Sequence, residues 1–164
     1  IMSVSSNIAK QTIKKKGYWN YSELYSFCFN WLKDNGYGIK ESEYVEKLSD
    51  FGKEIQLKWE GSRKVTDYFK FVINVEWHIL GMSDAVIERD GKQEKTNKGE
   101  IKLSVSADLV KDYEDNWDKK PMIKFMRGIY DKYIIRTTID NYGAVLKTDF
   151  GEYISQIKSF LELI

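Results

Sequence analysis

The sequence predicts an α+β fold: an N-terminal helix, a curved antiparallel sheet of about five or six strands, and C-terminal helices packed across one sheet face. Apolar side chains occupy every second position from Phe69 to Ile79 and again from Ile101 to Leu109, with mostly polar residues between them. This period of two is typical of strands that bury one face. Near the C-terminus, apolar residues lie three or four apart, which is typical of an amphipathic helix.

The 164-residue chain is expected to divide into a basic flexible arm, residues 1–18, and a single α+β domain, residues 19–164. The arm prediction rests on sparse hydrophobic residues and on clustered lysines with no acidic residue before position 20. Over the whole chain, 26 basic and 25 acidic residues give a net charge of +1. That balance does not by itself indicate a nucleic-acid or membrane-surface protein.

A helix is predicted after the arm. Asn20 and Glu23 resemble a capping box, apolar residues follow at helical spacing, and Asn35-Gly36 supplies a stop signal. Cys28 falls on the apolar face and is interpreted as a core residue rather than a reactive thiol. A lone cysteine cannot form an internal disulfide, so we expect a reducing compartment, cytoplasmic or virion-associated, rather than secretion.

The middle of the chain is predicted to form strands. The Asp90-Gly91 pair is a strong hairpin signal. The strand from about Tyr68 to Leu80 would span about 40 Å, so we expect it to bend. Strands are predicted over residues 39–48, 54–60, 68–80, 86–89, 92–96 and 101–109.

An acidic loop, residues 112–118, should precede a helix that begins near Pro121. The last helix is predicted from about Thr138 to the end of the chain, with Gly143 and Gly151 as points where it could break. No segment approaches the roughly 18 apolar residues of a membrane span, so none is predicted.

Candidate chemistry is sparse, and no catalytic, cofactor-binding or metal-ligating residue is predicted. His78, the single histidine, is interpreted as a sheet-face residue bonded to a cross-strand neighbour. The acidic residues at 112, 114, 115 and 118 are interpreted as a solvated turn rather than a cation site, because the glycine and terminal glutamate of an EF-hand loop are missing. We assign to the core the aromatic residues Trp59, Phe69, Phe71 and Trp77.

The residues best placed for a partner are basic or aromatic and lie in or beside the arm: Lys10, Lys14, Lys15, Lys16, Tyr18, Trp19 and Tyr21. The favoured hypothesis is a non-enzymatic structural or assembly protein that self-associates as a homo-oligomer through the N-terminal arm, a sheet edge or the C-terminal helix. One alternative is a pocket for an apolar ligand between the sheet and that helix. Another is contact with nucleic acid or an acidic surface through residues 10–16.

Two segments carry a resemblance. Residues from Trp59-Glu60-Gly61 through Met82, and residues 124–136, resemble a group of small, uncharacterised archaeal and virus-associated proteins, which implies no activity and no residue roles. In element order, a curved sheet followed by a long C-terminal helix is similar to the helix-grip ligand-binding folds. The predicted opening helix, in place of a strand, departs from that pattern.

Overall fold

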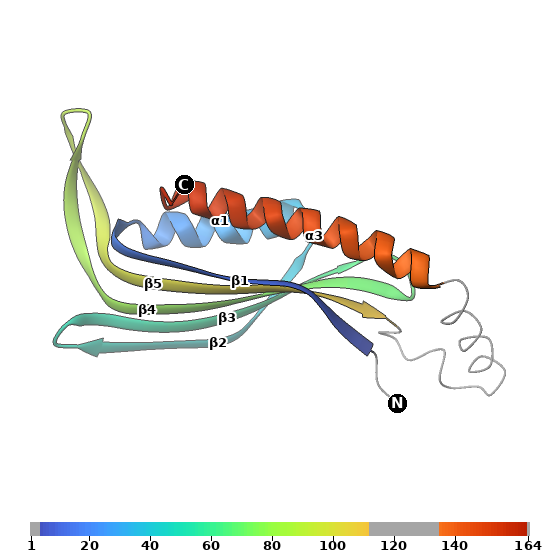
Figure 1. Ribbon diagram of the computed structural model, residues 1–164. Helices are drawn as coiled ribbons and strands as arrows, with labels where there is room; N and C mark the ends of the chain where they lie inside the picture. Colours follow the sequence, from blue (N-terminus) through green and yellow to red (C-terminus); the bar gives the residue numbers. More distant parts are fainter. Residues whose placement is uncertain (1–3, 112–134, 164) are drawn as a thin grey trace.

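The computed structural model describes residues 4–111 and 135–163. Its elements are β1 (Val4–Trp19), α1 (Tyr21–Asp34), β2 (Gly38–Ser49), β3 (Gly52–Lys64), β4 (Phe69–Arg89), β5 (Lys92–Lys111) and α3 (Ile135–Phe160). The strands form one 5-stranded antiparallel sheet in the order β1-β5-β4-β3-β2. This confirms the predicted α+β class and the predominantly antiparallel sheet. Figure 1 shows α1 and α3 on the same side of the sheet.

The expectation of a flexible arm is wrong for residues 4–18, which form most of β1 and pair with β5. Ile13 and Trp19 are buried, whereas Lys14 and Lys16 between them are exposed. A strand can therefore carry closely spaced lysines on one face while its other face joins the core. The expected element order is also wrong, because a strand precedes the first helix.

Local signals account for the ends of α1. The side chain of Asn20 accepts a hydrogen bond from the backbone N–H of Glu23 at 2.9 Å, and Asn35 occupies the C-cap. These contacts satisfy backbone groups that the helix itself leaves unpaired. The buried face of α1 carries Leu24, Cys28, Trp31 and Leu32.

β4 and β5 form a long hairpin of 21 and 20 residues. Its turn is the predicted Asp90-Gly91 pair, with φ values of 53° and 76°, as a two-residue turn with both central residues left-handed requires. The separate strands predicted over residues 68–80 and 86–89 form one strand, with an irregularity in register between Leu80 and Ser83 and with Gly81 at φ 64°. The strands predicted over residues 92–96 and 101–109 are likewise parts of one strand, β5.

The core lies between the sheet and the two helices. Trp59, Phe69, Phe71 and Trp77 are each at most 2% exposed, which confirms their assignment to the core. On α3, the ring of Tyr142 lies 5.1 Å from that of Phe69, and Tyr153 stacks on Trp31 at 4.4 Å. α3 is continuous through both glycines.

The predicted acidic loop of residues 112–118 and the helix predicted to begin near Pro121 lie outside the described residues. Within the described ranges, no helix combines the length and the apolar character that crossing a bilayer requires.

Candidate functional site

The residues predicted to bind a partner do not share one surface, because successive side chains of β1 point to opposite sides of the sheet. Lys15 and Trp19 point to the helix side: the Lys15 ammonium donates to the backbone carbonyl of Leu161, just beyond α3, and the Trp19 indole donates to the carbonyl of Gly99 at 3.1 Å. Tyr21, at the start of α1, is half-buried, with its ring 6.2 Å from that of Trp77. The remaining residues of the set are exposed to solvent: Lys10, Lys14, Lys16 and Tyr18.

The opposite face of the sheet is uncovered in the described part of the chain. On this face, Lys14 of β1 lies directly opposite Lys102 of β5, and Lys98 lies opposite Tyr18 with its Nζ 5.6 Å from the tyrosine ring. Like charges directly opposite each other destabilise a sheet. Glu100 of β5 lies opposite Lys16 and offsets part of this charge, but lysines still outnumber acidic residues on this basic half of the face, which would favour a bound anion.

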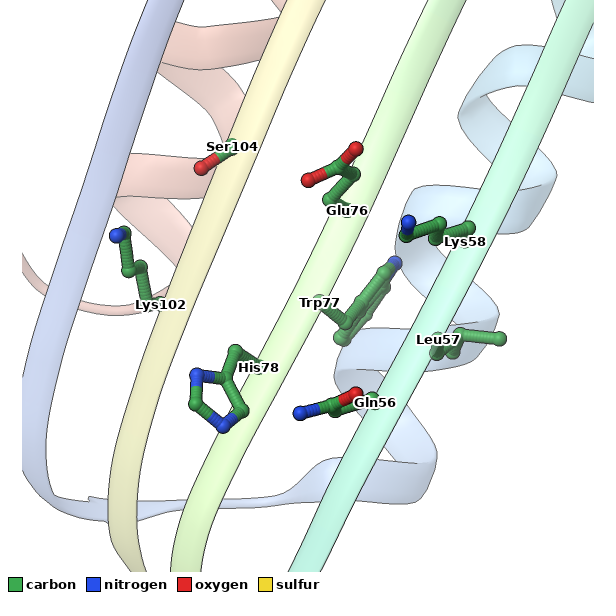
Figure 2. A pocket seen from close by; sticks show the side chains of 8 residues that line it. All are labelled: Gln56, Leu57, Lys58, Glu76, Trp77, His78, Lys102 and Ser104. Atoms are coloured by element: carbon green, nitrogen blue, oxygen red, sulfur yellow. The ribbon is translucent and has the colours of Figure 1, made fainter. Parts of the chain in front are cut away.

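A shallow groove of about 250 Å³ continues this face across β3, β4 and β5. Figure 2 shows Lys102 and Ser104 of β5 beside Glu76 and His78 of β4. His78 Nε2 lies 3.2 Å from Glu54 Oε1 on the neighbouring strand, which confirms the interpretation as a cross-strand-bonded sheet residue. Acidic and basic groups alternate here, so this half of the face has no dominant charge.

The sheet has two edges, and in the described ranges each edge strand pairs with one neighbour only: β1 with β5, and β2 with β3. An edge strand presents unpaired backbone N–H and C=O groups to another chain. The register is regular from Ala9 to Trp19 on β1 and from Glu43 to Ser49 on β2. These two runs are the parts of the edges able to accept another strand.

The two edges differ in charge. Lysine is the only charged residue type on β1, and edge lysines are a common protection against unwanted pairing. On β2, Glu43 and Lys47 carry opposite charges and face the uncovered side of the sheet together with Val45. Both edges are charged, but only that of β2 carries both signs.

The β2–β3 turn places two large apolar side chains in solvent. Leu48 is 82% exposed and Phe51 is 88% exposed. They lie at the end of the regular run of β2, beside Gly52, whose φ of 118° allows the tight turn. Exposed apolar groups beside an open edge are typical of a contact surface.

Nucleophilic or metal chemistry has little support in the described residues. Cys28 is 0% exposed, and burial raises the pKa of its thiol to about 12, so the reactive thiolate is suppressed. The burial agrees with its assignment to the core. No group of three or more His, Cys, Asp or Glu side chains with metal-binding geometry occurs among the described residues.

Sequence reasoning missed the β2 edge and the apolar turn. The predicted strand at residues 39–48 and the turn after it were available signals, because Leu48 and Phe51 stand next to turn-forming Ser49, Asp50 and Gly52. These local signals do not show that β2 pairs with β3 alone among the described strands, because that depends on strand order.

Comparisons with known proteins assign no family. No family model and no curated protein matches the chain. A solved structure of an uncharacterized protein from Rhizobium leguminosarum is similar over 99% of each chain, at 11% sequence identity and a TM-score of 0.27. A similarity at this level assigns neither fold nor function to the chain.

Proposed function

We propose that the protein is a non-enzymatic assembly module that forms a homodimer by pairing its β2 edges antiparallel across a two-fold axis. The observation that carries the proposal is the charge pattern of the regular run of β2. In an antiparallel pairing centred on Val45, Glu43 of each copy lies opposite Lys47 of the other. The strand is thus complementary to itself, as a two-fold interface requires.

The register centred on Val45 also avoids repulsion. It places Tyr44 opposite Glu46 and Val45 opposite Val45, with no like charges facing each other in the regular run. A register centred on Glu43 would oppose two copies of that carboxylate. Each opposite-charge pair contributes roughly 0.2–1 kcal/mol, and the backbone hydrogen bonds of the added strand contribute to affinity.

The exposed apolar turn supports the same arrangement. Leu48 and Phe51 lie at one end of the paired run, so dimerisation would bring them against the partner's strand and remove apolar area from water. On the other edge, antiparallel self-pairings of β1 centred on Thr12, Ile13, Lys14 or Lys15 would place lysines opposite one another. These features favour a closed dimer over an open chain of subunits.

Light scattering on a sizing column, over a range of concentrations, tests the proposal. The wild-type chain should give about twice its mass of 19.3 kDa. Glu43→Lys and Lys47→Glu should each raise the dissociation constant roughly tenfold, because two attractive pairs become repulsive. The matched control is Lys14→Glu, the same kind of charge reversal on the other edge, which should leave the dimer intact.

Mixing the two β2 variants gives the sharpest result. Each repels itself, but Glu43→Lys and Lys47→Glu are complementary to each other in the register centred on Val45. An equimolar mixture should therefore form a heterodimer, detectable by native mass spectrometry. A wild-type chain that stays monomeric at high concentration, or a mixture no tighter than the separate variants, would refute the proposal.

The basic half of the uncovered face favours a second candidate function, contact with nucleic acid. Lys14 and Lys16 lie two positions apart on β1, about 7 Å, and Lys10 lies on the same face four positions before Lys14. Lys98 and Lys102 of β5 face the same side, with Glu100 between them. Binding of a single-stranded oligonucleotide should weaken steeply as the salt concentration rises. Lys14→Glu should make this dependence of the affinity on salt less steep. Affinity that does not change with salt would exclude this candidate.

The apolar-ligand alternative has less support. Between the sheet and the C-terminal helix α3, the ring of Tyr142 lies 5.1 Å from that of Phe69 and 6.4 Å from that of Phe71. These side chains occupy space that an apolar ligand between the sheet and α3 would need. Native mass spectrometry of the purified chain tests for a retained apolar ligand, and a clean apo mass would dismiss it.

A further inference from the structure

A pocket of about 300 Å³ lies between the start of α1 and β2, on the helix side of the sheet. We call it the tyrosine pocket, because three tyrosine rings, two serines and one carboxylate line it: Tyr21, Ser22, Tyr25 and Ser26 from α1, and Glu41 and Tyr44 from β2. The volume is at the lower limit of roughly 300 Å³ for ligand pockets, so the occupant would be a small group.

Buried indoles support the tyrosine rings on α1. Tyr25 lies 4.9 Å from Trp59 with the ring planes at 81°, and Tyr21 lies 6.2 Å from Trp77 at 83°. Both tryptophans are only 2% exposed, so they form a fixed floor. Tyr44, which is 46% exposed, borders the open side.

The tyrosine hydroxyls already have partners. The Tyr25 hydroxyl donates to Glu41 Oε1 at 3.2 Å, and the Tyr44 hydroxyl donates to Glu46 at 3.3 Å. Burial and, second to it, the neighbouring Tyr44 raise the pKa of the Tyr21 hydroxyl. The faces of aromatic rings carry partial negative charge, so rings in the lining also give the pocket an attraction for cations.

Glu41 adds a full negative charge without a cationic partner. Its Oε1 accepts from the Trp59 indole at 3.3 Å as well as from Tyr25, but no Lys or Arg forms an ion pair with it in the described residues. The positive end of the α1 dipole lies nearby, and Glu23 in the first turn offsets it. The pocket should therefore attract a cation and repel an anion.

We propose that the tyrosine pocket binds the quaternary ammonium group of a small molecule. Such a group carries a positive charge but no N–H donors, so aromatic faces and a nearby carboxylate satisfy it. The proposal does not depend on the dimer.

Titration of the full-length chain with choline, followed by the ring signals of the tyrosines in NMR spectra, tests the proposal. The control probe is 3,3-dimethyl-1-butanol, which has the shape of choline but no charge. It should bind about threefold weaker or worse. Trimethyllysine, as the free amino acid, presents the same head group on a different tail and shows which tail the pocket prefers.

Variants locate the site. Tyr44→Leu and Glu41→Gln should each weaken choline binding at least about threefold, whereas Tyr44→Phe should retain it because the ring face remains. The matched control is Tyr18→Leu, since Tyr18 is 48% exposed on the other side of the sheet, and it should change nothing. Lys47→Glu should weaken the dimer, but Lys47 faces the uncovered side of the sheet, away from the pocket. Titrating this variant with choline therefore tests the pocket separately from dimerisation.

Three outcomes would overturn the assignment. The first is equal affinity for choline and its neutral analogue, and the second is binding of neither choline nor trimethyllysine. The third is a choline affinity that Tyr44→Leu leaves unchanged, which would place the binding site elsewhere on the molecule.

Discussion

Removing one oxygen atom from Tyr37 should make the protein more stable. Tyr37 is 3% exposed, and its hydroxyl has no hydrogen-bond partner among the described residues. A buried hydroxyl without a partner has lost its bonds to water without replacement, which costs about 1–3 kcal/mol. Tyr37→Phe removes that group and keeps the ring, so we expect a gain of about 1 kcal/mol in the free energy of unfolding.

Tyr153 provides a matched control, because the same substitution removes the same atom from a satisfied site. Its side chain is 0% exposed, and its hydroxyl donates to the backbone carbonyl of Cys28 at 3.1 Å. This bond joins α3 to α1. Tyr153→Phe should therefore lose about 0.5–1.5 kcal/mol, opposite in sign to the change at Tyr37.

Urea unfolding followed by tryptophan fluorescence measures both changes. The slopes should match that of the wild type, so that a shift in midpoint reports stability alone. In thermal unfolding, each 1 kcal/mol corresponds to roughly 2–4 °C for a chain of this size. If Tyr37→Phe loses as much stability as Tyr153→Phe, the Tyr37 hydroxyl has a partner in solution and the reasoning is refuted.

Three further predictions concern the turns, a carboxylate and the thiol. At Gly52, where φ is 118°, an alanine Cβ would lie 2.7 Å from the carbonyl oxygen of Met82. At Gly91, no atom of the described residues would lie within 4 Å of such a Cβ, so the urea midpoint should fall more for Gly52→Ala than for Gly91→Ala. Equal losses would contradict the clash. Burial raises the pKa of Asp149 despite Arg63 at 3.8 Å, so folding favours its protonated form and its charge weakens the fold above that pKa. Asp149→Asn should therefore have a higher melting temperature than the wild type at pH 7, and this difference should shrink as the pH falls through the pKa of the carboxyl group. A difference in melting temperature that grows as the pH falls would contradict this prediction. Cys28 should react with a thiol reagent only when the protein unfolds. If the reaction is as fast in the native protein as in urea, Cys28 is not buried in solution.

The sequence by itself determined which faces of the central strands are buried and where the tightest turn lies. Alternation from Phe69 to Ile79 predicted the core side chains, because a strand exposes successive residues on opposite faces. Asp90-Gly91 predicted the hairpin, because its backbone angles are tolerated by few residue pairs. Both properties are local to a short stretch of chain.

Only the tertiary structure decided the state of the N-terminal segment and the order of the strands. Lysines suit a disordered arm and the open face of a strand equally, and pairing with β5 distinguishes the two for residues 4–18. Whether Glu43 and Lys47 lie at a free edge, and whether Tyr21 meets Tyr44, depends on contacts between segments distant in sequence. Composition and periodicity describe each segment alone, so the partners of a strand or helix are set by the packing of the whole chain.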